Sequence, residues 1–596
     1  MRGSAGSVPG VDLGTIIRTR PAVPAVDHVA TENRYVPVGW GSARAGLPST
    51  AADVLIVDLA LAPDALVSLD GWEISGRAIL AGTPGTDPAG RRSIELLAPA
   101  NVPVEVEIVD HATGERVPGR VRFRAADGRY LPPAGHRDEV NPGFFEDSGA
   151  DLVLGSTTYA YVPGRFEIDL PVGPVDVEVV GGFDRPPYAA RIDIDPATRR
   201  LEVPLERTLE LHAGRWVTAD THVHFLAPST ALLQAAAEDV DLVNLLAAQW
   251  GDLFTNISDL PWGSMADSTG RRLIVMGTEN RQNMLGHLAL LGAHRPVISP
   301  LASGGPPEGR MATALSVLLA DWADRCRASG GLVVAAHFPL PYAEIAADIV
   351  SGKIDAIETQ ALSPGLDDPS VLEWYRFLNL GYRLPLVAGT DKMTAEVPVG
   401  AVRSYAHLLD DEPLSFERWA AAVRAGRTFV TSGPILELSV DGREPGDVIA
   451  LRSADRLEVA VRARAAQPVI TELELVVNGQ VVAATSAAAG SAELGLHEAV
   501  PIRAGSWIAA RSRSNQVIES AFTTSMAAHT SPVYVDVLDA PLVPPPDDGA
   551  AVEQIILGAR TWVAELAAIA EPRERTRMVG FLDASLETLR SRMTRP

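Results

Sequence analysis

The chain carries histidines and carboxylates at positions suited to holding divalent metal ions. His222 and His224 are two residues apart in DTHVHF (220–225), so on a strand both side chains would point to one face. Two imidazoles at a strand end supply half of a metal site, although an HxH pair alone is weak evidence. Four further groups lie at the borders of later apolar segments: Glu279 in IVMGTEN, His287 opening HLALLG, His337 in GLVVAAHF and Asp391 in LPLVAGTD. We therefore predict a metal centre built from these six residues.

Such a centre can hydrolyse an ester, carbamate or phosphoester without a protein nucleophile. A divalent ion lowers the pKa of bound water towards ~7 and polarises the scissile bond. Glu358, which ends the segment DAIET, is a candidate for proton transfer and equally for orienting a ligand histidine. Lys392 could stabilise a developing negative charge or replace the charge of a further metal ion, but it could also be a solvated side chain.

Four more residues are candidates for contacts with a substrate. Asn280 and Arg281 directly follow Glu279, although polar residues are common in loops. Trp250 could form the wall of an aromatic pocket, whereas a core tryptophan is the more frequent case. His529 would reach the centre only if its domain packs over it, and a surface or structural role is the alternative.

The elements that must position these residues form a central domain predicted over 210–433. Short apolar strands alternate there with helical stretches, as in RWVTADTHVHF, TALLQAAAEDV and DLVNLLAA, and a long helix is expected around ATALSVLLADWADRCRA. Nearly continuous apolar strands indicate parallel strands buried on both faces, which favours a (β/α) barrel. Barrels place catalytic groups at the carboxyl ends of their strands, where the predicted ligands fall.

All-β segments flank the central domain. Residues 1–100 contain short β-like pieces such as DVLIVDLAL and GRAILAG, and 101–209 alternates apolar and polar residues as a β-sandwich does. The same period returns over 434–541 and predicts a second sandwich. The tail 542–596 is helical, and its break at Pro572 predicts a helical hairpin. The fold class is thus multidomain, α/β in the centre and all-β on both sides.

Composition excludes several partners. A net charge of −24 argues against nucleic acid or an anionic membrane as the main partner. No run of about 18 apolar residues predicts a membrane span. The first residues, MRGSAGSVPG, lack the apolar core of a secretory signal, so we expect a cytoplasmic protein unless this sequence replaces a native signal. We expect the single cysteine, Cys326, to be a core residue and not a nucleophile. The sequence leaves the oligomeric state open.

The order of the motifs resembles the PHP-type metallohydrolases. HxH, then G-x-E followed by HLALLG, then an apolar strand ending in His, and finally G-[ST]-D is the pattern of that superfamily. GRTFVTSGP (426–434) and AHTSPVYV (528–535) are similar to its CehA/McbA group, whose named activity is carbaryl hydrolysis. The resemblance covers about 210–540 and implies a distorted (β/α) barrel.

The resemblance also implies how the ligands are shared. It assigns His222, His224 and Asp391 to one ion, His287 and His337 to a second, and Glu279 to a bridge with a catalytic role. Members with three metals carry a histidine two residues past the final aspartate, where this chain has Met393. We therefore expect one or two ions, with zinc first and manganese or iron also compatible.

Three functions stay open for this chain. The closest family implies hydrolysis of an aryl carbamate or carboxylic ester. The wider superfamily implies hydrolysis of a phosphomono-, di- or triester, which ranks second because the motif loops hold few cations and no Gly-rich phosphate loop. The third function is that of a non-catalytic binding protein with a relic barrel. The complete ligand set favours an enzyme acting on a small molecule.

Overall fold

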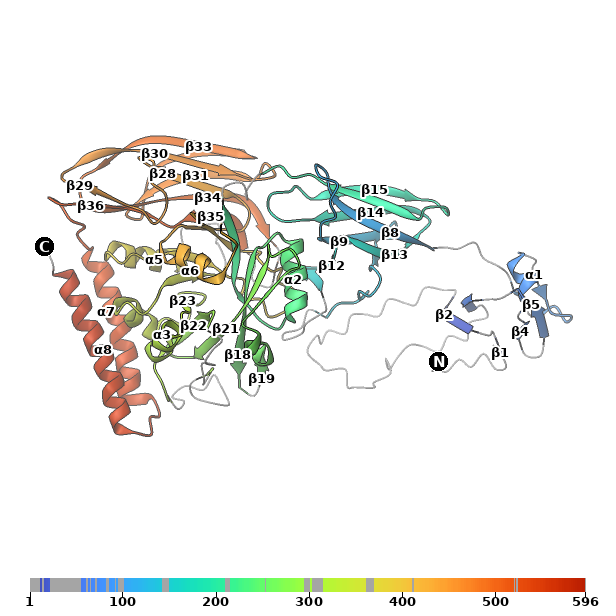
Figure 1. Ribbon diagram of the computed structural model, residues 1–596, viewed down its shortest axis with the longest axis horizontal. Coiled ribbons are helices and arrows are strands. Elements are labelled where there is room, and N and C mark those ends of the chain that lie inside the picture. Colours follow the sequence, from blue (N-terminus) through green and yellow to red (C-terminus); the bar gives the residue numbers. More distant parts are fainter. Residues whose placement is uncertain are drawn as a thin grey trace. The chain divides into compact units, whose positions relative to one another are not determined.

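The protein is described by a computed structural model, drawn in Figure 1. It describes residues 101–141, 150–209, 215–251, 253–293, 301–302, 315–360, 369–409, 412–518, 520 and 524–594, with shorter pieces between 11 and 94. The chain falls into two compact units, Met1–Val102 and Pro103–Pro596. Most described elements are strands, which form several sheets, and helices are fewer.

The first unit is built of short antiparallel strands. They are β1 (Val11–Asp12), β2 (Thr15–Pro21), β3 (Leu55–Ala60), β4 (Leu66–Leu69), β5 (Trp72–Ser75), β6 (Gly85–Thr86) and β7 (Ser93–Ile94), paired as β1–β4–β5, β2–β3 and β6–β7. The prediction of a β-like piece at GRAILAG is wrong, because helix α1 (Gly76–Leu80) occupies it. The Ser75 hydroxyl accepts a hydrogen bond from the Ala78 amide at 3.2 Å and so caps this helix.

The second unit begins with a β-sandwich. Its strands are β8 (Asn101–Asp110), β9 (Gly119–Ala125), β10 (Tyr130–Leu131), β11 (Asp151–Leu154), β12 (Thr157–Val162), β13 (Arg165–Pro171), β14 (Gly173–Val180), β15 (Tyr188–Ile194) and β16 (Arg200–Leu205). One sheet has the order β11–β12–β9–β14–β15 and the other β13–β8–β16. On β9, Val121, Phe123 and Ala125 are buried and alternate with arginines, which is the period-two pattern of a sheet with one covered face.

The central part of the second unit carries the predicted ligands. Its strands are β17 (Trp216–Val223), β18 (Leu242–Trp250), β19 (Leu253–Thr255), β20 (Ser264–Ala266), β21 (Leu273–Gln282), β22 (Gly286–Leu291), β23 (Leu332–Ala335), β24 (Ala356–Thr359), β25 (Leu386–Ala388), β26 (Arg403–His407) and β27 (Thr428–Thr431). Its helices are α2 (Pro228–Ala237), η2 (Ile257–Trp262), α3 (Leu319–Ala328), α4 (Ala343–Val350), α5 (Pro369–Asn379) and α6 (Phe416–Arg424).

The central strands form a mixed sheet. The pairs β17–β18, β18–β21, β23–β24 and β24–β25 are parallel, as the apolar strands predict. The pairs β21–β22, β22–β23, β17–β26 and β26–β27 are antiparallel, so the prediction of parallel pairing is wrong for these four pairs. The reason at β21–β22 is the short connection between them, since a tight hairpin can join only antiparallel strands.

The two ends of this sheet return to each other. The Ser404 hydroxyl on β26 accepts a hydrogen bond from the Ala388 amide of β25 at 2.7 Å. Thr390, which follows β25, donates its amide to the Asp220 carboxylate of β17 at 3.0 Å. All residues of β22 to β25 are buried, as strands covered on both faces require.

Helix α3 is shorter than the sequence pattern predicts. Of the expected segment ATALSVLLADWADRCRA, residues 312–314 lie outside the described residues and 315–318 are not helical. The helix begins at Leu319 because the Asp321 carboxylate accepts a hydrogen bond from the Leu318 amide at 3.0 Å. Cys326 on this helix is buried in the core, and burial raises the pKa of its thiol to about 12.

A second sandwich and a helical hairpin complete the unit. The strands are β28 (Ile435–Val440), β29 (Val448–Leu451), β30 (Asp455–Arg464), β31 (Ile470–Val477), β32 (Gln480–Ser491), β33 (Glu493–Ile502), β34 (Ser506–Ile518), β35 (Thr524–Thr530) and β36 (Val533–Val537), and the helical elements are α7 (Pro546–Thr561), η3 (Trp562–Leu566) and α8 (Pro572–Met593). Strand β27 of the central sheet pairs with β35, so backbone hydrogen bonds join this sandwich to the central part. Among the described residues, no helix combines the length and apolar character needed to cross a membrane.

The first sandwich is joined to the central part differently, by a buried carboxylate. Glu238, at the end of α2, accepts hydrogen bonds from the Arg120 guanidinium and the Tyr161 hydroxyl, both at 2.8 Å. The Arg403 guanidinium donates to the backbone carbonyls of Glu238 and Gly400, at 2.7 and 2.6 Å. A buried charge is costly without partners, and here the sandwich supplies them.

Candidate metal centre

The structure brings the six predicted ligands into two adjoining groups. Site A consists of His222, His224 and Asp391, and site B of Glu279, His287 and His337. Within each group the ligand atoms lie within 4.8 Å of one another. Imidazole nitrogens with carboxylate oxygens at such spacing are a donor set that suits zinc and other divalent ions. Either group could therefore hold a metal ion.

Strand β17 and the loop after β25 position site A. His222 lies on β17, His224 directly follows it, and Asp391 follows β25. The Asp220 carboxylate joins the two segments: it accepts hydrogen bonds from the His222 amide at 3.1 Å and from the Thr390 amide and hydroxyl at 3.0 and 2.7 Å. The two histidines and the aspartate are thereby held on one side of the sheet edge.

A hairpin and its neighbouring strand position site B. Glu279 lies on β21, and His287 lies on β22, where it pairs with Arg281. Because β21 and β22 are antiparallel, the start of β22 lies beside the end of β21. His337 follows β23, which pairs with β22. Antiparallel pairing thus explains how a histidine at a strand start joins ligands at strand ends.

Glu279 lies between the two sites. Its Oε2 is 3.4 Å from His224 Nε2 and 3.8 Å from His222 Nε2, in site A. Its Oε1 is 3.1 Å from His287 Nδ1 and 3.4 Å from His337 Nε2, in site B. A carboxylate with one oxygen turned to each group is placed to bridge two ions.

The ring nitrogens that face away from the centre fix the histidine tautomers. His222 Nδ1 lies 2.8 Å from Glu358 Oε1, and His224 Nδ1 lies 2.8 Å from the Leu246 carbonyl. His337 Nδ1 is bound to the Leu340 carbonyl at 2.5 Å. In the neutral form of each ring, an Nδ1–H that donates to this oxygen leaves the Nε2 lone pair directed into the centre. Metal-binding histidines are held in this way by acceptors behind them.

Unsatisfied atoms at the centre fit a bound cation. Glu279 is 1% exposed, and its Oε2 has no hydrogen-bond partner among the residues that the structure describes. The Nε2 atoms of His222 and His224 lie 3.0 Å apart, and both are 3.5 to 3.7 Å from Asp391 Oδ1. Buried polar atoms normally have partners, so converging lone pairs of this kind suit a cation.

Two ligands adopt strained backbone conformations. The φ angle is 46° at Asp391 and 32° at His337, in the left-handed region that residues other than glycine seldom adopt. Such conformations cost on the order of 1–3 kcal/mol each and persist where the surroundings impose them. Here the Gln360 amide group donates to Asp391 Oδ2 at 3.1 Å, and the His337 amide donates to Glu358 Oε1 at 3.0 Å.

The electrostatics of the metal-free centre follow from its partners. Burial alone would raise the pKa of Glu279, but the Arg281 guanidinium and His222 outweigh it and hold this pKa well below its usual range. Burial would lower the pKa of His222, yet the Glu358 carboxylate raises it well above its usual value. For His287 burial dominates and lowers the pKa to about 4, so this imidazole is neutral at neutral pH.

Glu358 lies behind site A. It is fully buried, and its Oε2 accepts a hydrogen bond from the Thr221 hydroxyl at 2.6 Å, while Oε1 faces His222 Nδ1. Of the two roles considered from the sequence, this position favours orienting a ligand histidine over proton transfer.

The interpretation of Lys392 as a solvated side chain is wrong. Lys392 is 2% exposed, and its ammonium group donates to the carbonyls of Thr394 and Val397 at 2.8 and 2.6 Å. Carbonyls of the following loop therefore replace water around this charge. In this conformation Lys392 stabilises the loop that carries Asp391 through these two hydrogen bonds.

Two of the four substrate-contact candidates lie at the centre. The Trp250 ring packs edge-on against the His224 ring, with centroids 5.0 Å apart. The Arg281 guanidinium lies over Trp250 at 4.5 Å, and its Nη1 is 3.6 Å from Glu279 Oε2. A cation and an aromatic ring thus border the ligands.

The other two candidates lie elsewhere. Asn280 is fully buried and binds the Thr278 hydroxyl at 2.7 Å, on the face of β21 opposite to Glu279. Both ring nitrogens of His529 are engaged, by the Tyr375 hydroxyl at 2.5 Å and the Thr530 carbonyl at 2.8 Å. Burial lowers the pKa of His529 to about 3. This histidine packs β35 against α5, which is the structural role considered from the sequence.

Sequence reasoning missed two residues that position the ligands. Asp220 stands in the quoted motif DTHVHF, where its place two residues before His222 was a usable signal. Gln360, which holds Asp391, follows the strand DAIET and has no pattern that distinguishes it from any other loop glutamine.

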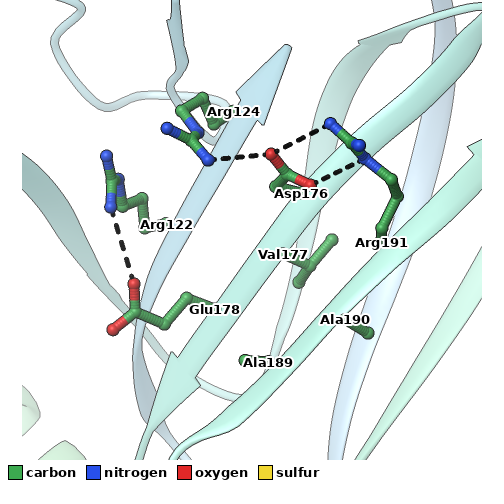
Figure 2. A pocket seen from close by; sticks show the side chains of 8 residues that line it. All are labelled: Arg122, Arg124, Asp176, Val177, Glu178, Ala189, Ala190 and Arg191. Carbon is green, nitrogen blue, oxygen red and sulfur yellow. Dashed lines mark hydrogen bonds and ion pairs between the residues drawn. The ribbon is translucent and has the colours of Figure 1, made fainter. Parts of the chain in front are cut away.

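A surface hollow on the first sandwich is not part of the centre. The hollow has a volume of about 360 Å³. Figure 2 shows the residues that line it, on β9, β14 and β15. Asp176 binds Arg124 and Arg191 at 2.9 and 3.0 Å, and Glu178 lies 3.7 Å from Arg122. The arginines are paired across neighbouring strands, as on an ordinary solvated sheet face.

No model of a known protein family matches the chain, and no curated protein matches it significantly. A function is therefore inferred from the chemistry and geometry of the centre.

Proposed function

We propose that the protein is a metal-dependent hydrolase that cleaves an ester-type bond with water. The observation that carries this proposal is the position of Glu279, which turns one oxygen to site A and the other to site B. Five further donor groups surround it, and three imidazoles have an oxygen acceptor at Nδ1, which favours the tautomer that binds a metal through Nε2. A non-catalytic binding protein that kept the barrel only as a scaffold would have no need of these six donor groups.

The six ligands fit two divalent ions, zinc first. When bound, such ions activate water and polarise the bond to be cleaved. The chain's own residues hold the centre ready: Asp220 ties the two segments of site A together, and Glu358 fixes the His222 ring. Because the ligand side chains are buried or nearly so, bulk water has little access to the donor atoms.

We further propose that the central part is a distorted (β/α) barrel of the PHP type, in its CehA/McbA group. The strand order β26–β17–β18–β21–β22–β23–β24–β25 and the contacts of β25 with β26 and β17 support a closed arrangement. The two stretches that carried the closer resemblance, 426–434 and 528–535, contain β27 and parts of β35 and β36, and β27 pairs with β35.

The preferred substrate is an aryl carbamate or carboxylic ester, as the resemblance implies. A phosphoester is the second candidate, and Arg281 favours it. Its guanidinium lies 3.6 Å from the bridging carboxylate, where it could bind a phosphoryl oxygen. The sequence, which has few cations in its motif loops, gave this candidate less support.

The test is metal content and hydrolysis, measured on the full chain. We would compare the wild type with His222→Ala/His224→Ala and with His497→Ala, a control whose side chain is 70% exposed on the second sandwich. Each protein would be analysed for bound metal and assayed on aryl carboxylic esters, aryl carbamates and aryl phosphates.

We expect bound zinc, manganese or iron and hydrolysis in the wild type and the control, and loss of both in the double variant. The substrate panel then ranks carbamate and carboxylic ester against phosphoester. Absence of metal and of hydrolysis, even after metal addition, would refute the proposal and leave a multidomain binding protein.

A further inference from the structure

Exposed apolar side chains gather on one short segment beside the candidate centre. Leu253, Ile257 and Trp262 are 38%, 38% and 63% exposed, and we call these three residues the apolar rim. They fall within ten residues of chain, on β19 and η2. Large apolar side chains exposed singly are normal on proteins, but a cluster of them marks a binding surface.

The apolar rim is held on a fixed support. Strand β19 pairs with the last residues of β18, and Leu260 within η2 is buried in the core. The Thr255 hydroxyl and the Asn256 side-chain carbonyl accept hydrogen bonds from the Phe225 amide at 3.1 and 2.9 Å. The exposed side chains therefore project from an anchored segment.

The same bonds join the apolar rim to the centre. Phe225 is the residue directly after the ligand His224, so the rim is attached to site A through one backbone amide. In the β18–β19 pairing, Leu253 lies opposite Trp250. Residues opposite each other in an antiparallel pair share a face, so Leu253 extends the apolar surface of the ring that packs on His224.

A second border of the centre is also apolar. Leu340 is 71% exposed, and its backbone carbonyl accepts the hydrogen bond from Nδ1 of the ligand His337. Exposed apolar side chains thus lie next to a ligand of site A and next to a ligand of site B.

The chemistry of the rim selects an uncharged occupant. Residues 253–262 (LFTNISDLPW) contain no lysine or arginine. Their one carboxylate, Asp259, accepts a hydrogen bond from the Asn256 side-chain amide at 2.9 Å. This segment offers no cation to an anionic membrane or an acidic partner. It can contribute to binding through the burial of apolar surface.

We propose that the apolar rim binds the apolar group of the substrate, so that the enzyme acts on uncharged esters with a large aliphatic or aryl group. This inference rests on the proposed function for the cleavage step, because the rim itself only binds. A group lying from Leu253 towards Trp262 would place the attached ester bond beside Trp250 and the ligands.

Binding can be tested without turnover, by calorimetric titration of the full chain with octan-1-ol and butan-1-ol. Complete burial of a methylene strengthens binding about fourfold, so four extra methylenes on a partly open surface should give at least about tenfold tighter binding. The test variant is Leu253→Ser/Ile257→Ser, which changes the residue opposite Trp250 and its neighbour on η2. The matched control is Val481→Ser/Val482→Ser on β32, where the two valines are 40% and 49% exposed.

We expect octanol to bind more tightly than butanol to the wild type and the control, with at least a tenfold loss of octanol affinity in the test variant. For p-nitrophenyl esters, the ratio of kcat/KM for octanoate over butanoate should fall by a similar factor in that variant only. Equal affinity for the two alcohols, or unchanged octanol binding in the variant, would overturn the inference. Tight octanol binding by a protein that cleaves no ester would support the apolar site while refuting the proposed function.

Discussion

Buried carboxylates occur in two places in the central part of the molecule, and they differ in their partners. At the candidate centre, burial would raise both pKa values, but Arg281 with the histidines holds that of Glu279 below its usual range, and His222 does so for Glu358. On α4, Glu344 and Asp348 are also fully buried, but burial raises the pKa of Glu344 to about 8 and that of Asp348 well above its usual value.

Neighbouring charges account for the difference, since the Arg281 guanidinium lowers the pKa of Glu279 and His222 lowers that of Glu358. One oxygen of Glu344 accepts a bond from the Ala320 amide at 3.0 Å. Its other oxygen and both oxygens of Asp348 have no hydrogen-bond partner in the part of the chain that the structure describes. The comparison shows that a buried acid is charged only where cationic or donor groups converge on it, so burial alone does not mark a functional carboxylate.

The largest effect is expected from Glu279→Gln, which keeps the shape of the bridging group and removes its charge. Both sites would lose an anionic donor. Loss of a residue that only orients a metal ligand lowers metal affinity about 10- to 100-fold, and loss of a ligand shared by both ions should lower it by more. Metal content after dialysis would measure this, with hydrolysis as a second readout. Retention of both ions by the variant would mean that Glu279 is not a shared ligand.

Glu344→Gln should act on stability in the opposite direction. The pKa of this carboxyl rises from 4.5 to about 8 on folding, so the unfolded chain ionises first and the wild type loses stability as pH rises through this interval. Glutamine carries no such penalty. The variant should be more stable than the wild type by on the order of 4 kcal/mol at the upper end of the interval, and nearly equal to it at the lower end.

Urea unfolding of the full chain at both ends of that pH interval would measure the gain. Glu587→Gln on α8, where the side chain is exposed, is the matched control and should show no pH-dependent gain. A variant that is no more stable than the wild type at the upper end would mean that Glu344 is charged in the folded protein, as Glu279 and Glu358 are.

Glu358→Gln tests the same comparison at the candidate centre, where the buried carboxylate is charged. The amide can still occupy the space behind His222, but it no longer supplies the charge that fixes the imidazole. Affinity at site A should fall about 10- to 100-fold, while site B keeps its ion. Metal titration of the metal-free protein would resolve the two sites. Equal weakening of both sites would instead indicate a general loss of structure.

A smaller effect is expected from Gln360→Ala. This change removes the 3.1 Å bond to Asp391 Oδ2, while Oδ1 still faces site A. One hydrogen bond contributes about 0.5–1.5 kcal/mol, so metal affinity at site A should fall by a factor of about 2 to 13. The same titration would measure it, and a loss as large as that of Glu358→Gln would contradict this ranking.

The ligand residues could be predicted from the sequence because each stands at the border of an apolar segment, where strands meet at one sheet edge. The position of Glu279 on β21 also carried information about its neighbour: strand alternation alone turns Asn280 to the other face. The antiparallel turn from β21 to β22 could not be predicted, since the apolar runs are alike for parallel and antiparallel strands.

Contacts made by loops could not be predicted from the sequence either. The burial of Lys392 depends on carbonyls of Thr394 and Val397, which become acceptors only through the conformation of that loop. The assignment of His529 to the α5 interface depends on Tyr375, more than a hundred residues earlier in the chain. Sequence spacing has no bearing on pairs of this kind.

The shared carboxylate of Glu238 limits how freely the domains could be exchanged in evolution. A recombination event that joined a different sandwich to the central part would inherit Glu238 without Arg120 and Tyr161, and so with an uncompensated charge at the new junction. The acquired module would need a cation and a hydroxyl at the same two places before the fusion could be stable. We therefore expect the first sandwich and the central part to change together among relatives, even though the first sandwich holds none of the candidate ligands.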